Sequence, residues 1–178
     1  MFEFSPTKTN KKAHKIIIIL FAVSAALLVT SAILSGVPYI WTVQLVALIL
    51  AMCAILLSSR YLAKNFVYRI YENGERTLDL TVTEKKSKKD SGVTVCRIAL
   101  TSIISAELLE GKKKLRDYKK EGKPIFDYRP DIDPEKSILI LSSEGGEETY
   151  ICLAYNEELF AILSPYAASG EDGDENEE

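Results

Sequence analysis

Two apolar stretches decide the fold of this chain: IIIILFAVSAALLVTSAIL at residues 16–34 and IWTVQLVALILAMCAILL at residues 40–57. Neither contains a charged residue. Each has the length that a helix needs to cross the ~30 Å hydrocarbon layer of a bilayer, about 20 residues. The intervening SGVPY suffices only for a tight turn, which Gly36 and Pro38 favour. The two stretches therefore predict a transmembrane helical hairpin at residues 16–57.

A cleaved signal peptide or a buried hairpin in a soluble protein could also produce apolar stretches near the N-terminus. The first stretch is longer than the roughly 7–15 apolar residues of a signal peptide, and a second stretch follows it at once. Charge-free runs of at least ~18 residues are typical of membrane spans rather than of soluble cores. We therefore expect an integral membrane protein with two spans.

Basic residues flank both expected spans and are absent from the turn between them. They are Lys8, Lys11, Lys12 and Lys15 before the first span, and Arg60, Lys64 and Arg69 after the second. The positive-inside rule then predicts that both termini lie in the cytoplasm, with Tyr39 on the other side of the cell membrane. Neither span carries an ionisable residue in its middle, which favours an anchor over a pore or proton path.

Four polar residues lie within the spans, and we expect them to form hydrogen bonds between the two helices. They are Ser24, Thr30 and Ser31 in the first span and Gln44 in the second.

The sequence divides into four segments. Residues 1–15 form a basic cytoplasmic N-terminus, 16–57 the hairpin, 66–168 a cytoplasmic domain and 169–178 an acidic tail. The tail has no apolar residue to bury and is expected to be disordered. The net charge of −3 for the whole chain therefore conceals a basic remainder.

Alternating apolar residues and turn signals predict a small mostly-β domain of six or seven antiparallel strands. The expected strands are 66–71, 77–83, 93–98, 102–110, 124–128, 137–141 and 149–154; a helix is the alternative for 102–110, and 124–128 is a short edge strand. Asn156 is expected to cap a C-terminal helix that stops or kinks near Ser164, because Pro165 cannot donate a backbone hydrogen bond. The turn spacing is typical of a small sandwich or barrel, and a barrel left open at one end is expected to be covered by this helix. The expected core comprises Leu78, Leu80, Val82, Ile98, Ile140, Ile151, Leu153, Leu159 and Leu163.

Three stretches carry a resemblance to a known family. They are YRIYENG at 68–74, RIALTSI at 97–103, and the final strand and helix at 150–163. In this order after two spans, they resemble bacterial pleckstrin-homology-like membrane proteins with two N-terminal transmembrane helices. The chain departs from the family in the basic segment 111–123 and at Pro165. The resemblance implies a pleckstrin-homology-like (PH-like) domain that serves binding or assembly, without catalytic residues.

The residues offer little for catalysis or metal binding. The only histidine, His14, lies at the membrane flank, so Ser and Cys in the domain have no histidine partner. The acidic group Asp127, Asp131, Asp133 and Glu135 is framed by prolines and lacks the glycine of a calcium loop. Cys53, Cys96 and Cys152 lack ligand spacing. We therefore expect no enzyme activity, no cofactor and no metal.

Lysine-rich segments are the candidate site. The first contains Lys85, Lys86, Lys88 and Lys89; the second contains Lys112, Lys113, Lys114, Arg116, Lys119, Lys120 and Lys123. Near a membrane such residues attract anionic lipid headgroups, whereas the alternative is a solvated edge that prevents strand aggregation. Tyr118 is the only aromatic residue among them, which disfavours nucleic acid.

Two functions remain open at this point. One is a membrane-anchored module that recruits a cytoplasmic or membrane protein partner or an anionic lipid surface. The other is an accessory subunit of a transporter or membrane enzyme, packing through the hairpin.

Overall fold

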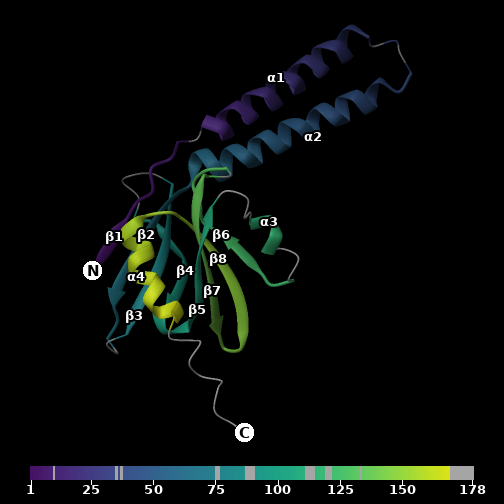
Figure 1. Cartoon of the computed structure of the whole chain (residues 1–178). Coiled ribbons are helices and arrows are strands. Elements are labelled where there is room, and N and C mark those ends of the chain that lie inside the picture. Colours follow the sequence, from purple (N-terminus) through teal and green to yellow (C-terminus); the bar gives the residue numbers. More distant parts are fainter. Residues whose placement is uncertain are drawn as a thin grey trace. The chain divides into compact units, whose positions relative to one another are not determined.

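The computed structural model describes residues 1–9, 11–34, 36, 38–74, 77–86, 91–110, 115–118, 122–132 and 134–168. The chain forms two compact units (Figure 1). The helical unit comprises Lys8–Lys64, and the β-rich unit comprises Met1–Thr7 together with Asn65–Glu178.

The helical unit consists of α1 (Lys11–Ile33), α2 (Ile40–Ser58) and the π-helical turn η1 (Ser59–Ala63). The helix α1, and α2 together with η1, are each long and apolar enough to cross a membrane. At the base of the hairpin, the Lys8 ammonium donates to the Leu62 carbonyl oxygen at 3.1 Å. The predicted helical hairpin is confirmed.

Small residues form the contact between α1 and α2. Ala13 on α1 and Ala47 and Ala54 on α2 are fully buried, whereas most large apolar side chains of both helices are exposed. Small side chains let two helices approach closely, and close packing is what holds helices together in lipid. The Ser24 hydroxyl adds a hydrogen bond across the contact, donated to the Ala47 carbonyl oxygen at 2.9 Å.

The expectation of a bridging role was right only for Ser24. The hydroxyls of Thr30 and Ser31 donate to the carbonyl oxygens of Ala26 and Leu28 in their own helix. A serine or threonine hydroxyl in a helix reaches the carbonyl oxygen three or four residues earlier in the same helix more readily than it reaches a neighbouring helix. Gln44 is exposed on α2.

The first sheet of the β-rich unit is a four-stranded antiparallel sheet in the order β1-β2-β3-β4. Its strands are β1 (Phe2–Phe4), β2 (Asn65–Glu72), β3 (Leu78–Lys85) and β4 (Val93–Ala99). The short 3₁₀ turn η2 (Leu100–Ser102) leads from it to the second sheet.

The second sheet has the order β5-β7-β8-β6. Its elements are β5 (Ile103–Glu110), the short helix α3 (Leu115–Tyr118), β6 (Ile125–Asp127), β7 (Lys136–Glu144) and β8 (Glu147–Ala154). The ambiguous stretch 102–110 is thus a strand. Strand β6 lies at an edge, as predicted, but it pairs parallel to β8, so the all-antiparallel expectation was wrong. The reason is that the chain passes from β5 to the opposite edge of the sheet before it forms β6.

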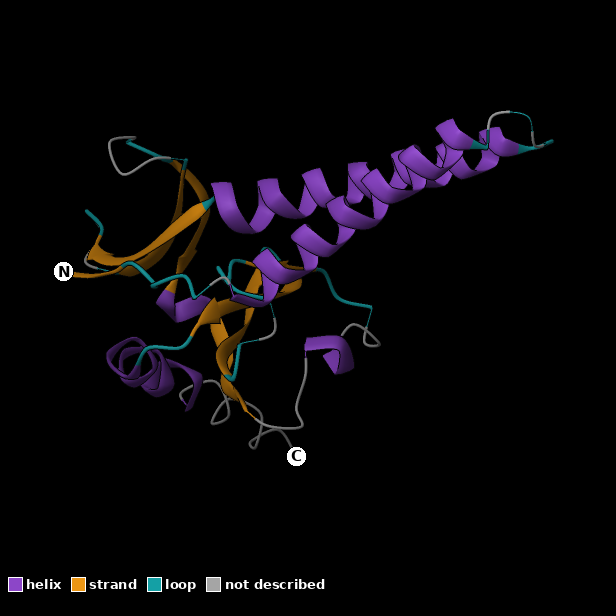
Figure 2. Cartoon of the chain, turned by 90° about the horizontal axis from the view of Figure 1, so that it is seen from above, coloured by secondary structure: helices purple, strands orange, loops and turns teal. Residues whose placement is uncertain are grey.

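The expected barrel is not present among the described residues, because the strands form two separate open sheets (Figure 2). Alternation along a strand identifies the buried face but does not determine whether two sheet edges hydrogen-bond to each other. Here each outer strand, β1 and β4 in the first sheet and β5 and β6 in the second, pairs with one neighbour only, so neither sheet closes among the described residues.

One large core lies between the sheets and under the C-terminal helix α4 (Glu157–Ala168). Of the expected core residues, all but Leu78 are buried, and Leu78 packs against them half-buried. Leu159 and Leu163 of α4 are completely buried in this core. Asn156 caps the helix as predicted, accepting a hydrogen bond from the Leu159 N–H at 2.9 Å.

The helix α4 continues through Pro165 to Ala168, so the predicted stop near Ser164 was wrong. Proline at this position leaves the Ala161 carbonyl oxygen without its usual backbone donor. The Ser164 hydroxyl donates to that oxygen instead, at 3.5 Å. The missing backbone hydrogen bond affects only the last turn of the helix, which contains few such bonds.

Strand β1 was not expected from the sequence. Phe2, Glu3 and Phe4 pair with Ile70, Arg69 and Tyr68 of β2, in an antiparallel register. The helical hairpin is therefore inserted in the chain between two neighbouring antiparallel strands of one sheet.

Candidate functional site

The structure describes only part of the two predicted lysine-rich segments. Lys85 is the last residue of β3, and Lys86 follows it as an exposed residue. Arg116 is a residue of helix α3. The remaining predicted lysines, namely Lys88, Lys89, Lys112, Lys113, Lys114, Lys119 and Lys120, lie outside the described residues.

The register of the first sheet positions Lys85. It pairs with Asn65, the first residue of β2, and only Lys64 separates Asn65 from the end of η1. The first lysine-rich segment therefore begins at the end of the sheet where the chain leaves the helical hairpin.

Gly92 closes the turn that contains this segment. Its φ of +77° lies in the left-handed region, and a Cβ there would come within 2.7 Å of the Thr83 and Lys85 side chains. Only glycine fits both the conformation and the close approach. The return of the chain from β3 to β4 thus depends on Gly92.

Exposed apolar side chains lie next to this turn. Val93 pairs with Glu84, and Val95 follows at a bulge where Val82 pairs with Cys96 and Thr83 pairs with Thr94. Val93 is 70% exposed and Val95 37% exposed. These exposed apolar side chains were not predicted from the sequence, although their signal is present: lysines, then Gly92, then VTV at residues 93–95.

Helix α3 is the described middle part of the second lysine-rich segment. Leu115 and Tyr118 of α3 pack on a smaller apolar cluster that includes Leu109, Leu139 and Tyr150. The Tyr118 hydroxyl donates to Glu107 Oε2 at 2.8 Å. This short helix therefore covers the sheet face that points away from the main core.

Lys123, the last predicted base of this segment, is engaged within the domain. Its ammonium is 2.6 Å from Glu148 Oε2 and 5.6 Å from the centroid of the Tyr150 ring. The ion pair and the cation–π contact therefore hold the Lys123 side chain within the domain, where its role is structural.

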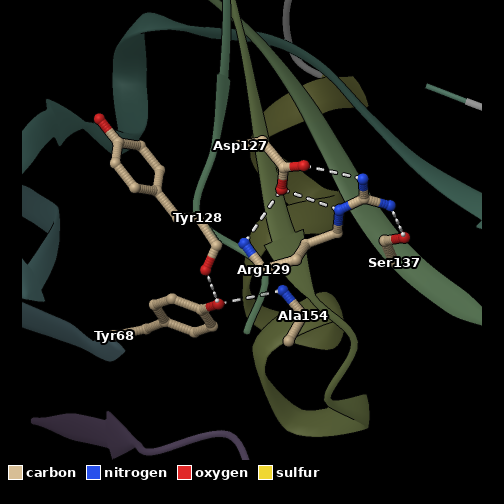
Figure 3. Close-up of polar contacts among 6 residues, drawn as sticks. All are labelled: Tyr68, Asp127, Tyr128, Arg129, Ser137 and Ala154. Carbon is tan, nitrogen blue, oxygen red and sulfur yellow. Dashed lines mark hydrogen bonds and ion pairs between the residues drawn. The ribbon is translucent and has the colours of Figure 1, made fainter. Parts of the chain in front are cut away.

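Tyr68 links the two sheets (Figure 3). It is fully buried; its hydroxyl donates to the Tyr128 carbonyl oxygen at 2.9 Å and accepts from the Ala154 N–H at 3.1 Å. The Tyr128 ring in turn packs edge-on against Phe66, and its hydroxyl donates to the Val95 carbonyl oxygen at 3.2 Å. These bonds join β2 and β4 of the first sheet to the second sheet.

Asp127, the first residue of the predicted acidic group, is engaged within the domain. Arg129 forms a two-pronged ion pair with Asp127, at 2.9 Å to each carboxylate oxygen, and donates to the Ser137 hydroxyl at 3.2 Å (Figure 3). Among the described residues, which exclude Asp133, no three His, Cys, Asp or Glu side chains gather as they would around a metal ion. The arrangement fixes the segment after β6.

The two cysteines of the β-rich unit are poor nucleophiles. Burial raises the pKa of the Cys152 thiol to about 12, and burial likewise raises the pKa of Cys96. The thiolate is the reactive form, so both side chains are protonated and inert near neutral pH.

Glu3 and Arg69 hold β1 on β2 through two hydrogen bonds of 3.0 and 3.2 Å. The hydrogen bond from Arg69 lowers the pKa of Glu3. Phe2 and Phe4 on the same strand pack against the main core.

Comparison of the chain with protein-family models, with curated proteins and with solved structures found no match.

Proposed function

We propose that this protein is a membrane-anchored, non-catalytic binding or assembly module whose folded domain is held at the cytoplasmic face of the cell membrane. The observation that carries the proposal is the insertion of the helical hairpin between β1 and β2. Paired neighbouring strands lie about 4.8 Å apart, so the chain before α1 and the chain after η1 must be on one side of the bilayer. Two spans satisfy this condition, whereas one span does not.

The cytoplasmic orientation is supported by charge. Lysines and arginines flank both ends of the hairpin in the sequence, and the turn around Tyr39 has none. The exposed aromatic rings of Tyr39 and Trp41 suit the headgroup layer at the opposite surface.

A PH-like assignment for the domain is supported by its connectivity. The strands β2-β3-β4 form one antiparallel meander, β5-β7-β8 form a second one, and α4 packs its apolar face on the core between them. Strands β1 and β6 are additions to this arrangement. Domains of this type serve as scaffolds, which agrees with the raised pKa values of Cys96 and Cys152.

The anchoring is tested by extracting membranes of expressing cells with alkaline carbonate. We expect the full-length chain to remain with the lipid fraction and to require detergent for release. Recovery in the aqueous fraction would overturn the proposal, because two inserted helices do not leave the bilayer at high pH.

One observation favours the second function, an accessory subunit that packs on a partner's spans. The amide of Gln44 is exposed on α2, and it forms no hydrogen bond with any residue that the structure describes. Amide side chains in spans form hydrogen bonds between helices. Exchange of residues 11–63 for an unrelated two-span anchor separates the functions: the binding module retains its activity, and the accessory subunit loses it.

A further inference from the structure

We infer that the edge of β2 covered by β1 is a docking site for an extended segment of a partner protein. That segment carries an acidic residue between two aromatic residues, and a basic residue two positions before the first aromatic one. Strand β1 is then an internal competitor, which the partner displaces when it docks. This inference rests on the proposed function, because it names the chemistry that the binding module recognises in its partner.

Strand β1 lies beside β2 at the edge of the first sheet (Figure 1), and its side chains show which chemistry this edge accepts. Phe2 and Phe4 are half-buried against the main core, and the Phe4 ring centroid is 6.0 Å from that of Tyr68. Glu3, between them, accepts the two hydrogen bonds from Arg69 on the opposite face. A strand added to a sheet edge gains affinity from main-chain hydrogen bonds and specificity from alternating side chains. This edge therefore favours the order aromatic, acidic, aromatic.

Strand β1 occupies only part of this edge. It pairs with three residues of β2, which is eight residues long. Tyr71 and Glu72 come next along β2, and in the described part of the chain no strand pairs with them on this side. Met1, which precedes β1, is 99% exposed and adds no packing there. A longer segment would pair with Tyr71 and Glu72 as well, and would make more contacts than β1 does.

The charge of Glu72 indicates what the longer segment carries. Phe2 pairs with Ile70, so in the same antiparallel register the residue opposite Glu72 lies two positions before the first aromatic residue. Glu72 is exposed at the end of its strand. Opposite charges directly across two paired strands stabilise the pairing, whereas like charges oppose it. A basic residue at this position therefore complements the edge.

A second copy of the chain does not supply such a segment. The order aromatic, acidic, aromatic recurs in the sequence only at Phe126–Tyr128. There Asp127 is already held by Arg129, and Pro124 rather than a base stands two positions before Phe126. The occupant that fits this edge is thus a segment of another protein.

Strand β1 is held by few contacts, which makes its displacement feasible. It has three paired residues, and the ion pair of Glu3 with Arg69 joins side chains that are 45% and 33% exposed. Such a pair is screened by solvent, and short elements with few buried contacts open readily. Because its attachment to α1 keeps β1 close to the edge, a competitor needs the additional pairing with Tyr71 and Glu72.

The test measures binding of a fluorescently labelled, capped hexapeptide, Lys-Thr-Phe-Glu-Phe-Ser, to the full-length protein in detergent micelles by fluorescence anisotropy. The lysine is placed opposite Glu72 and the glutamate opposite Arg69. Anchoring of the same protein is measured separately by carbonate extraction. Failure of the docking site is therefore distinguished from failure of the membrane anchor.

Glu3→Lys weakens the internal competitor, because it places like charges on β1 and β2 while Arg69 stays in place. We expect this substitution to tighten binding of the hexapeptide at least about threefold, which corresponds to the loss of an exposed ion pair. Glu147→Lys, an equal change of charge at an exposed position of β8, is the matched control and should leave the affinity unchanged.

A reversal of charge identifies the site. A second hexapeptide with lysine in place of the glutamate should bind the unsubstituted protein more weakly. The double variant Glu3→Lys with Arg69→Glu keeps opposite charges between β1 and β2, and it should prefer the second peptide. The same preference in both proteins, no gain in Glu3→Lys, or no binding of either peptide would overturn the inference. So would dimerisation of Glu3→Lys that the hexapeptide does not reverse, because that result would assign the edge to a second copy.

Discussion

Removal of the Tyr68 hydroxyl should weaken the connection between the two sheets without changing the packing. Tyr68→Phe keeps the buried ring and deletes one oxygen that makes two hydrogen bonds, to the Tyr128 carbonyl and the Ala154 N–H. Each backbone group left without a partner costs about 1–3 kcal/mol when buried. Tyr128 and Ala154 are half-buried, so water compensates in part. We expect a loss of about 2 kcal/mol in the free energy of unfolding.

The assay is urea unfolding of the full-length protein in detergent micelles, followed by near-ultraviolet circular dichroism of the tyrosines. With a denaturant dependence of about 2 kcal/mol per molar urea, the midpoint should fall by about 1 M. Tyr71→Phe is the matched control, since the Tyr71 hydroxyl makes no hydrogen bond with the described residues. Equal midpoints for the two variants would refute the role of the Tyr68 hydroxyl.

Three further predictions concern the core, the lysine turn and β1. Leu163→Ala should lower the free energy of unfolding by about 2–5 kcal/mol, because this side chain of α4 is completely buried in the main core. A loss below about 1 kcal/mol by the same assay would contradict that packing. Gly92→Ala should lower the free energy of unfolding by at least about 1–2 kcal/mol, because the backbone of Gly92 is left-handed. Gly74→Ala, with open space around it, should leave this free energy nearly unchanged. Equal effects of the two substitutions would exclude the close approach at Gly92. The pKa of Glu3 is lowered on folding, so its contribution to holding β1 is complete above about pH 4.5 and is lost as the pH falls through the lower folded value. The protection of the β1 amides against hydrogen exchange, measured relative to the intrinsic exchange rate at each pH, should therefore fall at acid pH, and Glu3→Gln should remove that dependence. An unchanged dependence in Glu3→Gln would assign it to another group.

Much of the β-rich unit follows from its sequence, because alternation is a local signal. The Asn-Gly turn after β2 and the Gly145–Gly146 turn between β7 and β8 mark where strands end. Asn156 identifies the first turn of α4 for the same reason: the acceptor and the N–H it serves are three residues apart.

What the sequence did not predict depends on contacts between distant residues. Strand β1 has three residues, too few for a recognisable period, and it forms because Glu3 and the flanking phenylalanines meet β2 some 65 residues later. The parallel pairing of β6 depends on the path of the chain around the second sheet. Likewise, no local pattern shows that Lys85 pairs with Asn65.

The candidate site was predicted in part. The sequence shows that lysines cluster, but two clusters of similar composition are indistinguishable until the register ties one of them to the hairpin. Val93 also reads as an ordinary strand residue until β4 is found at an edge of its sheet.

The most direct test of the two-span anchor is the side of the membrane on which the chain lies before and after the hairpin. Ser5→Cys follows β1, Gly74→Cys follows β2, and Tyr39→Cys lies in the turn between the spans. Cells expressing each variant are treated with a membrane-impermeant maleimide, with the unsubstituted chain as the blank. We predict that Tyr39→Cys reacts in intact cells and that Ser5→Cys and Gly74→Cys react only after the membrane is opened. Reaction of Ser5→Cys and Gly74→Cys from opposite sides would contradict the insertion of a two-span hairpin between paired strands.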